Sequence, residues 1–256
     1  MADGNNNLTG RREPPRFRVV SLQDARPFGE RLLRCTFSGS DLEGFVVNEP
    51  AASIRLLVPT GDGLVMPRWN GNEFLFQDGT RPTIRTFTPR MFDPIALNLV
   101  VDVLLHEGGT VAEWARTARL GASAAISGPG RGYTIEAHVD GFLLAGDETA
   151  IPAISQLVES IPDDVPIRVD IELVPGYAEP SLPAHPQIEV NWHVLPAGAK
   201  SGDTLVAAIG SVQIADGVKV WCAGEASAMH RIRTNLFKER GIARADATVR
   251  GYWKSR

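Results

Sequence analysis

Cysteine is scarce in this sequence, with Cys35 and Cys222 the only two among 256 residues. There is no Cys-x-x-Cys pair and no cluster of cysteine with histidine, which excludes an iron–sulfur framework, a disulfide-stapled fold and a metal site of the protein's own. Long apolar runs are also missing, since no stretch is long enough to cross a bilayer and the first residues contain no apolar signal core. These absences predict a protein of the reducing cytoplasm without a membrane span.

A strong excess of positive charge is missing as well. The formal net charge is −4 at pH 7, and charged residues make up an ordinary 22% of the chain. This mildly acidic balance argues against a protein that binds nucleic acid or anionic membranes in general. The length allows one large domain or two of modest size, and two is the better expectation.

The hydrophobic pattern changes once along the chain, near residue 139. Before it, short alternating runs separated by Gly, Pro and Asp turns predict an antiparallel barrel or sandwich, completed by strands at 98–105 and 122–127. After it, apolar strands predicted at 142–145, 167–173, 188–192 and 218–222 alternate with helices at 150–160, 204–209 and 227–240. The sequence therefore predicts a β-barrel domain over 16–139 and an α/β domain with a parallel sheet over 140–256.

The segment Arg85-Thr86-Phe87-Thr88-Pro89-Arg90 combines cations, an aromatic ring and a hydroxyl group. The period of a strand places Arg85 and Phe87 on one face, and Thr88 with Arg90 on the other. Such a set suits a planar, phosphorylated ligand. Taken alone, the segment also fits a barrel strand with solvated arginines.

The next predicted strand carries Asp102 and His106 with the same parity on an otherwise apolar face, although a lone histidine is more often structural than a ligand contact. Thr110 and Glu113 then match a capping box, which predicts a helix that Thr110 caps and that runs to about Arg119 and stops at Gly121. The first turn of this helix offers free backbone N–H groups and the positive end of the helix dipole. A pyrophosphate fits such a site.

Taken together, these segments resemble the siderophore-interacting proteins, a family of flavin-dependent ferric-siderophore reductases related to the ferredoxin reductases. The family's Arg-x-Tyr-Thr-x-Arg motif stands at 85–90, with Phe87 in place of tyrosine, and its Asp-x-x-x-His strand stands at 102–106. Its Gly-Asp-Glu-Thr-Ala-x-Pro turn stands at 146–152, and its Trp-x-Ala-Gly-Glu and Gly-Tyr-Trp signatures stand at 221–225 and 251–253. Where the family often has Gly-Pro-Ala, this chain has Gly109-Thr110-Val111.

The resemblance implies a ferredoxin-reductase-like fold, with an FAD-binding barrel and an α/β domain like those that bind NAD(P)H. It implies that Arg85 pairs with flavin phosphate, that Phe87 packs on the flavin and that Thr88 bonds its ring system. The other implied cofactor contacts are His106, Thr110 and Ala112 at the pyrophosphate, Asp102 at a hydroxyl or at a neighbouring strand, Thr149 beside the flavin, and Ala223 and Glu225 beside the nicotinamide. Asp147 and Glu148 are expected to cap the helix that follows them.

Cations near the C-terminus are the candidates for substrate binding, because ferric catecholate and carboxylate chelates are anionic. They are Arg250 and Lys254, with Arg68 as a weaker third, although a solvated C-terminus explains them nearly as well. No catalytic side chain is predicted, since the flavin performs the redox chemistry.

The implied activity is the reduction of iron(III) in a siderophore inside the cell, with electrons from NADPH, NADH or ferredoxin passing through FAD, and release of iron(II). Two alternatives stay open. One is a general NAD(P)H-dependent flavin reductase or diaphorase, and the other is a siderophore-binding protein without catalytic activity.

Overall fold

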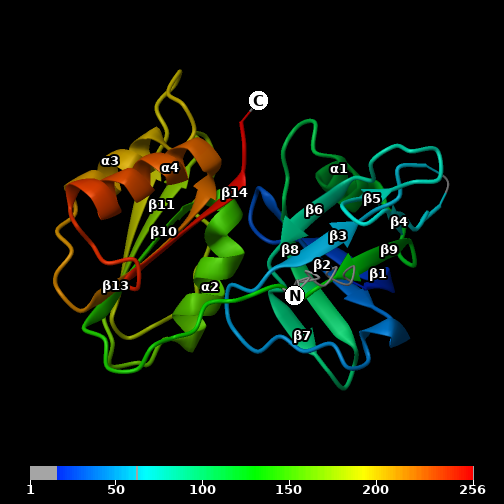
Figure 1. The fold of residues 1–256 in the computed structure, drawn as a ribbon, viewed down its shortest axis with the longest axis horizontal. Coiled ribbons are helices and arrows are strands. Elements are labelled where there is room, and N and C mark those ends of the chain that lie inside the picture. The colour runs from blue at the N-terminus through cyan, green and yellow to red at the C-terminus, as the bar shows by residue number, and fades with distance from the viewer. Residues whose placement is uncertain (1–15, 62, 256) are drawn as a thin grey trace, which may run out of the picture.

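The computed structural model describes residues 16–61 and 63–255, which form two domains side by side (Figure 1). The first domain contains a seven-stranded antiparallel sheet of order β6-β3-β9-β1-β2-β8-β7 and a hairpin of β4 and β5. The bounds are β1 (Phe17–Pro27), β2 (Leu32–Ser38), β3 (Ile54–Leu57), β4 (Arg68–Trp69), β5 (Phe74–Leu75), β6 (Ile84–Phe87), β7 (Met91–Asp93), β8 (Asn98–Leu104) and β9 (Ser123–Ser127).

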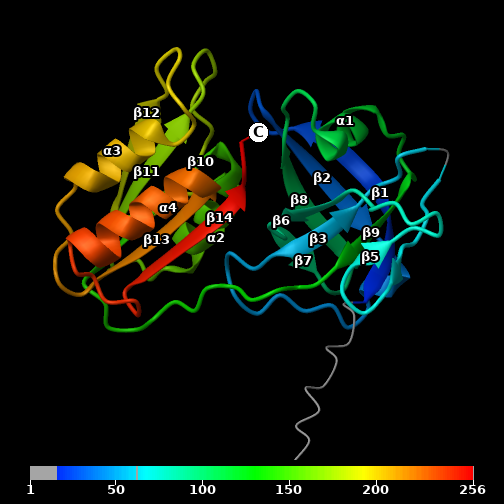
Figure 2. The same ribbon diagram turned by 45° about the horizontal axis from the view of Figure 1, so that its top comes forward.

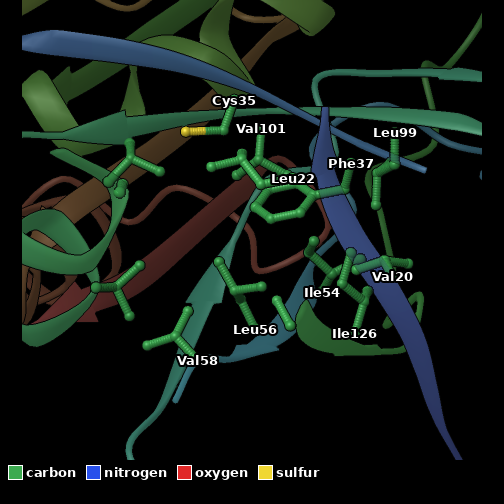
Figure 3. Close-up of a cluster of buried hydrophobic side chains, with 14 of the residues drawn as sticks. Val20, Leu22, Cys35, Phe37, Ile54, Leu56, Val58, Leu99, Val101 and Ile126 are labelled. Carbon is green, nitrogen blue, oxygen red and sulfur yellow. The ribbon is translucent and has the colours of Figure 1, made fainter. Parts of the chain in front are cut away.

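The antiparallel sheet curls around its own apolar face. Side chains alternate along each strand, so Leu22, Phe37, Leu56, Val101 and Ile126 meet in one buried cluster (Figure 3). Helix α1 (Thr110–Thr117) covers one end of this cluster with Val111, Ala112 and Ala115. The fold thus leaves the first turn of α1 at the end of the sheet, directly after β8.

The second domain is a parallel sheet of order β12-β11-β10-β13-β14, with helices on both faces. Its strands are β10 (Gly141–Asp147), β11 (Ile167–Leu173), β12 (Ile188–Val194), β13 (Val218–Glu225) and β14 (Ala247–Trp253). Helix α2 (Ile151–Ser160) covers one face, while α3 (Asp203–Ser211) and α4 (Ala226–Thr234) cover the other. Every residue of β10 is buried, because this central strand is covered on both sides.

Helix α2 also joins the two domains. Figures 1 and 2 both show it between the two sheets, and its apolar side packs in one cluster with Leu32 and Ala51 of the first domain. The domains therefore share a continuous apolar interface.

The predicted fold class is confirmed, with a barrel-like antiparallel domain followed by an α/β domain. The details differ at two places. The helix expected over 227–240 ends as α4 at Thr234 and continues as a π-helical turn over Asn235–Glu239. The strand β14 at the C-terminus was not expected, because its residues carry no run of apolar side chains and form a strand by pairing with β13.

Among the described residues, no helix has the length and apolar content needed to cross a membrane. Nor does that part of the chain hold any group of three or more His, Cys, Asp and Glu side chains placed to bind a metal ion.

Both cysteines are expected to be inert in the folded protein. Cys35 and Cys222 are fully buried, and burial raises the pKa of each thiol to about 12. Because the thiolate is the nucleophile, iodoacetamide at about pH 8 should label neither residue in native protein and both in denaturant. Intact-mass measurement reads the number of adducts, and rapid labelling of the native protein would contradict the buried placement.

Candidate functional site

Arg85 and Phe87 lie on the edge strand of the antiparallel sheet. In the pairing of β6 with β3, Arg85 stands opposite Leu56 and Phe87 opposite Ile54. Opposite residues of antiparallel strands project to the same face, and Ile54 and Leu56 belong to the core. Arg85 and Phe87 therefore share the inner face at the open edge of the barrel, as the sequence predicts.

The environments of these two side chains differ. Phe87 is half-buried and packs against the barrel core. Arg85 is exposed, and its guanidinium donates to the carbonyl of the neighbouring Ile84 at 3.0 Å. Within residues 16–61 and 63–255, no carboxylate forms an ion pair with Arg85. A free cation thus stands beside an aromatic ring.

The start of α1 differs from the predicted capping box. Gly109, not Thr110, is the N-cap, and no side chain bonds the first turn. The first backbone bond runs from Glu113 N–H to the Gly109 carbonyl at 2.8 Å. A Cβ at position 109 would stand 2.6 Å from the ring atoms of His106, so a glycine fits closely at this position. The chain therefore enters the helix at a glycine, and the N–H groups of the first turn stay open to an anion.

His106 is exposed and stands directly against this turn. Its Nδ1 lies 3.0 Å from the Glu107 carbonyl, so Nδ1 carries the proton and Nε2 stands beside Gly109. The structure thus brings together His106 and the backbone of Thr110 and Ala112, as predicted.

Asp102 has a structural partner. Both of its carboxylate oxygens accept from Arg34 on β2, at 2.7 Å each, and the Arg34 guanidinium lies 3.8 Å from the centre of the Phe28 ring. The bond to Asp102 raises the pKa of Arg34. Of the two roles weighed for Asp102, the structure supports the bond to a neighbouring strand.

The last three residues of the 85–90 segment, Thr88 to Arg90, contact the second domain. Thr88 is buried and faces the Tyr252 phenol, whose pKa burial raises to about 12. The Gln156 amide of α2 donates to the carbonyls of Pro89 at 2.7 Å and Arg90 at 3.2 Å. Arg90 itself forms a two-bond ion pair with Glu159, also on α2, at 2.5 and 2.8 Å. Sequence reasoning missed Gln156, since a glutamine on a helix carries no signal of its partner.

The carboxyl ends of β10 and β13 hold three further predicted residues. Both the N–H and the hydroxyl of Thr149 donate to Asp147, at 3.0 and 2.5 Å, so Asp147 caps the short 3-10 turn Glu148–Ala150. Helix α2 itself has no side-chain cap, and Glu148 pairs with Arg31, so the expected caps of this helix are wrong. Ala223 is fully buried within β13. Glu225 is the N-cap of α4 and accepts from Ala228 N–H at 2.9 Å. Thr149 and Glu225 therefore already have partners in the protein.

The predicted basic cluster does not assemble. Arg250 spans the domain interface and donates to the carbonyls of Ala51 at 3.0 Å and Gly132 at 2.6 Å. Lys254 is exposed near the end of β14, and Arg68 is exposed on β4. Figures 1 and 2 show the β4–β5 hairpin at the outer side of the barrel, away from the end of β14. Lys254 is the one of the three that stands free beside the domain boundary.

The Asp102→Asn substitution is expected to destabilise the protein without touching the cofactor site. It leaves Arg34 against a neutral amide in a largely buried position, and we expect the free energy of unfolding to fall by about 2–4 kcal/mol. Urea denaturation measures this change. The matched control is Asp24→Asn, whose partner Arg26 is exposed, with an expected change below about 0.5 kcal/mol. A loss of bound flavin with unchanged stability would restore the cofactor role.

Comparisons with known proteins agree with this arrangement. The model of the siderophore-interacting FAD-binding domain matches residues 21–133, and that of the siderophore-interacting protein matches 139–256. An uncharacterised protein of Mycobacterium tuberculosis is 34% identical over 93% of this chain and 89% of its own. Ferric vibriobactin reductase ViuB of Vibrio cholerae is 28% identical over 93% of this chain and 89% of its own length.

Among solved structures, the crystal structure of a siderophore utilization protein from T. fusca superposes with a TM-score of 0.82. It is 31% identical, and the match covers 94% of each chain. The fold is also that of ferredoxin reductases. The chain therefore belongs to the siderophore-interacting protein family, whose FAD-binding domain matches residues 21–133 and precedes the α/β domain.

Proposed function

We propose that this protein is an FAD-dependent reductase of ferric siderophores that releases iron as iron(II), with electrons from NAD(P)H or ferredoxin. The observation that carries this proposal is the anion site of the first domain. An unpaired guanidinium at Arg85 and an uncapped helix N-terminus at Gly109 both border strand β8. An exposed guanidinium and a helix N-terminus without a side-chain cap are both sources of positive charge, which suits a pyrophosphate.

The residues present fit FAD. Arg85, His106 and the backbone N–H groups at Thr110 and Ala112 would hold its phosphates, and Phe87 offers a ring face for the flavin. Phenylalanine in place of tyrosine removes one hydroxyl donor and keeps the stacking surface. Thr88 remains a proposed contact through its backbone and hydroxyl, although its side chain faces Tyr252.

Bound FAD accepts two electrons at once and passes them on one at a time, so one hydride donor reduces two iron(III) ions. The chain contributes binding and electrostatics. Lys254 adds a positive charge beside the domain boundary, which attracts an anionic chelate. Iron(II) is held weakly by oxygen chelators designed for iron(III), and it leaves.

Two other functions stay distinguishable by experiment. A general flavin reductase or diaphorase would turn over quinones, free flavins and ferric chelates equally well. A siderophore-binding protein without catalysis would purify colourless, take up no FAD and still bind ferric chelate. An absorption spectrum of the purified protein, followed by anaerobic NADPH or NADH and then each acceptor, separates the three.

Replacing Arg85 by alanine should weaken flavin binding. The loss of one charge-assisted hydrogen bond corresponds to about 1.5–3 kcal/mol, or roughly a 10- to 150-fold rise in the Kd for FAD. Titration of apoprotein by flavin fluorescence quenching gives the Kd. Arg81→Ala is the control, because Arg81 is exposed and already paired with Glu73. Equal Kd values for the two variants and wild type would remove Arg85 from the site.

Replacing Lys254 by alanine should affect the substrate and not the cofactor. We expect the KM for an anionic ferric chelate to rise about two- to fivefold, with a smaller effect at high salt, because an exposed charge acts over a screened distance. Bound flavin should be unchanged. Steady-state rates with a neutral ferric chelate serve as the control. An identical KM at low salt would place the attracting charge elsewhere.

A further inference from the structure

The parallel sheet has one place where open α/β sheets bind ligands. All strands are parallel, and their order is β12-β11-β10-β13-β14. The chain adds β11 and β12 on one side of β10 and then β13 and β14 on the other, so the strand order reverses between β10 and β13. In such sheets, ligands bind outside the carboxyl ends of the strands at this point of reversal. A dinucleotide normally sets its pyrophosphate on a helix N-terminus there. The state of these helix N-termini therefore decides how this domain recognises an electron donor.

Asp147, the last residue of β10, lies at this point of reversal. Its Oδ1 accepts from Thr149, and its Oδ2 accepts from Glu225 N–H at 2.9 Å and from the Trp253 indole at 2.8 Å. A Cβ at Gly224 would stand 2.6 Å from Oδ2, so the carboxylate lies directly on the backbone of β13. One buried carboxylate thus ties the ends of β10, β13 and β14 together.

The N-terminus of α3 is closed by Glu172, a buried residue of β11. Its carboxylate accepts from the N–H groups of Gly202 at 2.5 Å, Thr204 at 3.0 Å and Leu205 at 3.2 Å, and from the Thr204 hydroxyl. The remaining N–H of this turn, on Asp203, donates to the Lys200 carbonyl at 3.0 Å. No donor of the first turn is left for a phosphate.

Glu225, which is 2% exposed, is the N-cap of α4. It accepts from Ala228 N–H at 2.9 Å and from Ser255 N–H at 3.3 Å. Burial raises the pKa of Glu225, but these backbone donors outweigh it and leave the pKa below its ordinary value. The carboxylate is therefore ionised at neutral pH.

The segment before α2 completes the set. Asp147 takes the N–H of Thr149, and Pro152 in the first turn of α2 has no N–H to offer. All three helices at this edge thus begin with a carboxylate of the chain or a missing donor. Helix α1 of the first domain differs, because neither a side-chain cap nor a proline occupies its first turn.

A dinucleotide phosphate at this edge would have to displace a buried carboxylate from its hydrogen bonds and then lie beside its charge. Both effects are unfavourable. Lys200 and Lys254 are exposed near the edge, but an exposed lysine adds a screened charge and no directed set of donors.

We propose that Asp147, Glu172 and Glu225 determine donor specificity by denying the phosphates of NAD(P)H a binding site. The donor is then recognised through its dihydronicotinamide ring alone. This inference rests on the proposed function, in which a hydride leaves C4 of the dihydronicotinamide, carries two electrons to the flavin and leaves oxidised nicotinamide behind. NADPH, NADH and a donor without the adenosine phosphate half should serve equally.

The test is anaerobic stopped-flow reduction of the holoenzyme by NADPH, NADH and reduced nicotinamide mononucleotide. The three bimolecular rate constants should agree within about tenfold, and millimolar ADP-ribose should not inhibit. A phosphate held by two charge-assisted hydrogen bonds would give a preference above about a hundredfold. Such a preference for NADPH or NADH over the mononucleotide, or competition by ADP-ribose, would overturn the proposal.

A variant that lacks the Glu172 carboxylate tests the same idea in the opposite direction, by asking whether phosphate binding appears. Glu172→Ala frees the first turn of α3, and calorimetry should then detect ADP-ribose binding that wild type lacks. If circular dichroism shows that this variant does not fold, Glu172→Gln removes the charge and keeps an acceptor, and it should bind ADP-ribose more tightly than wild type. Wild type binding ADP-ribose as well as either folded variant would contradict the proposal. These titrations need no flavin, so a protein that takes up no FAD would refute the proposed function and leave this test intact.

Discussion

The contact between helix α2 and the loop after β6 is the constraint on which the arrangement of the two domains depends. The Gln156 amide bonds the carbonyls of Pro89 and Arg90 and accepts from Ala51 N–H at 2.9 Å, while Glu159 pairs with Arg90. Pro89 and Arg90 belong to the same short segment that presents Arg85 and Phe87. The segment therefore cannot shift without breaking bonds to the second domain, and the flavin motif and the parallel sheet keep one relative placement.

Charge is divided between the domains in a way that follows from how each helix begins. Helix α1 begins at a glycine and has no side-chain cap, so its positive end stays available. Helices α3 and α4 begin on Glu172 and Glu225, which neutralise their positive ends. On the proposed function, the first domain holds the phosphates of the cofactor, and the second domain offers no comparable site for the phosphates of the donor.

Parity and the order of motifs were sufficient to predict where several polar side chains of the candidate site lie on the fold. The alternation of a strand placed Arg85 and Phe87 on one face, and the register with β3 agrees. The glycine turn after His106 predicted a helix N-terminus that is open to anions, which the structure has at Gly109 instead of Thr110. The cap therefore lies one residue earlier than the capping pattern predicts.

The sequence by itself determined the two fold classes, the change between them near residue 139 and the segments that carry polar groups, because these follow from local periodicity and composition. Only the tertiary structure decided which polar groups are free. In the sequence, Arg85, Asp102 and Arg250 are all charged residues that could contact a ligand. In the structure, Arg250 bonds the carbonyls of Ala51 and Gly132, and Asp102 bonds Arg34. The partners of a charged side chain lie up to 199 positions away along the chain, and only folding brings them within bonding distance.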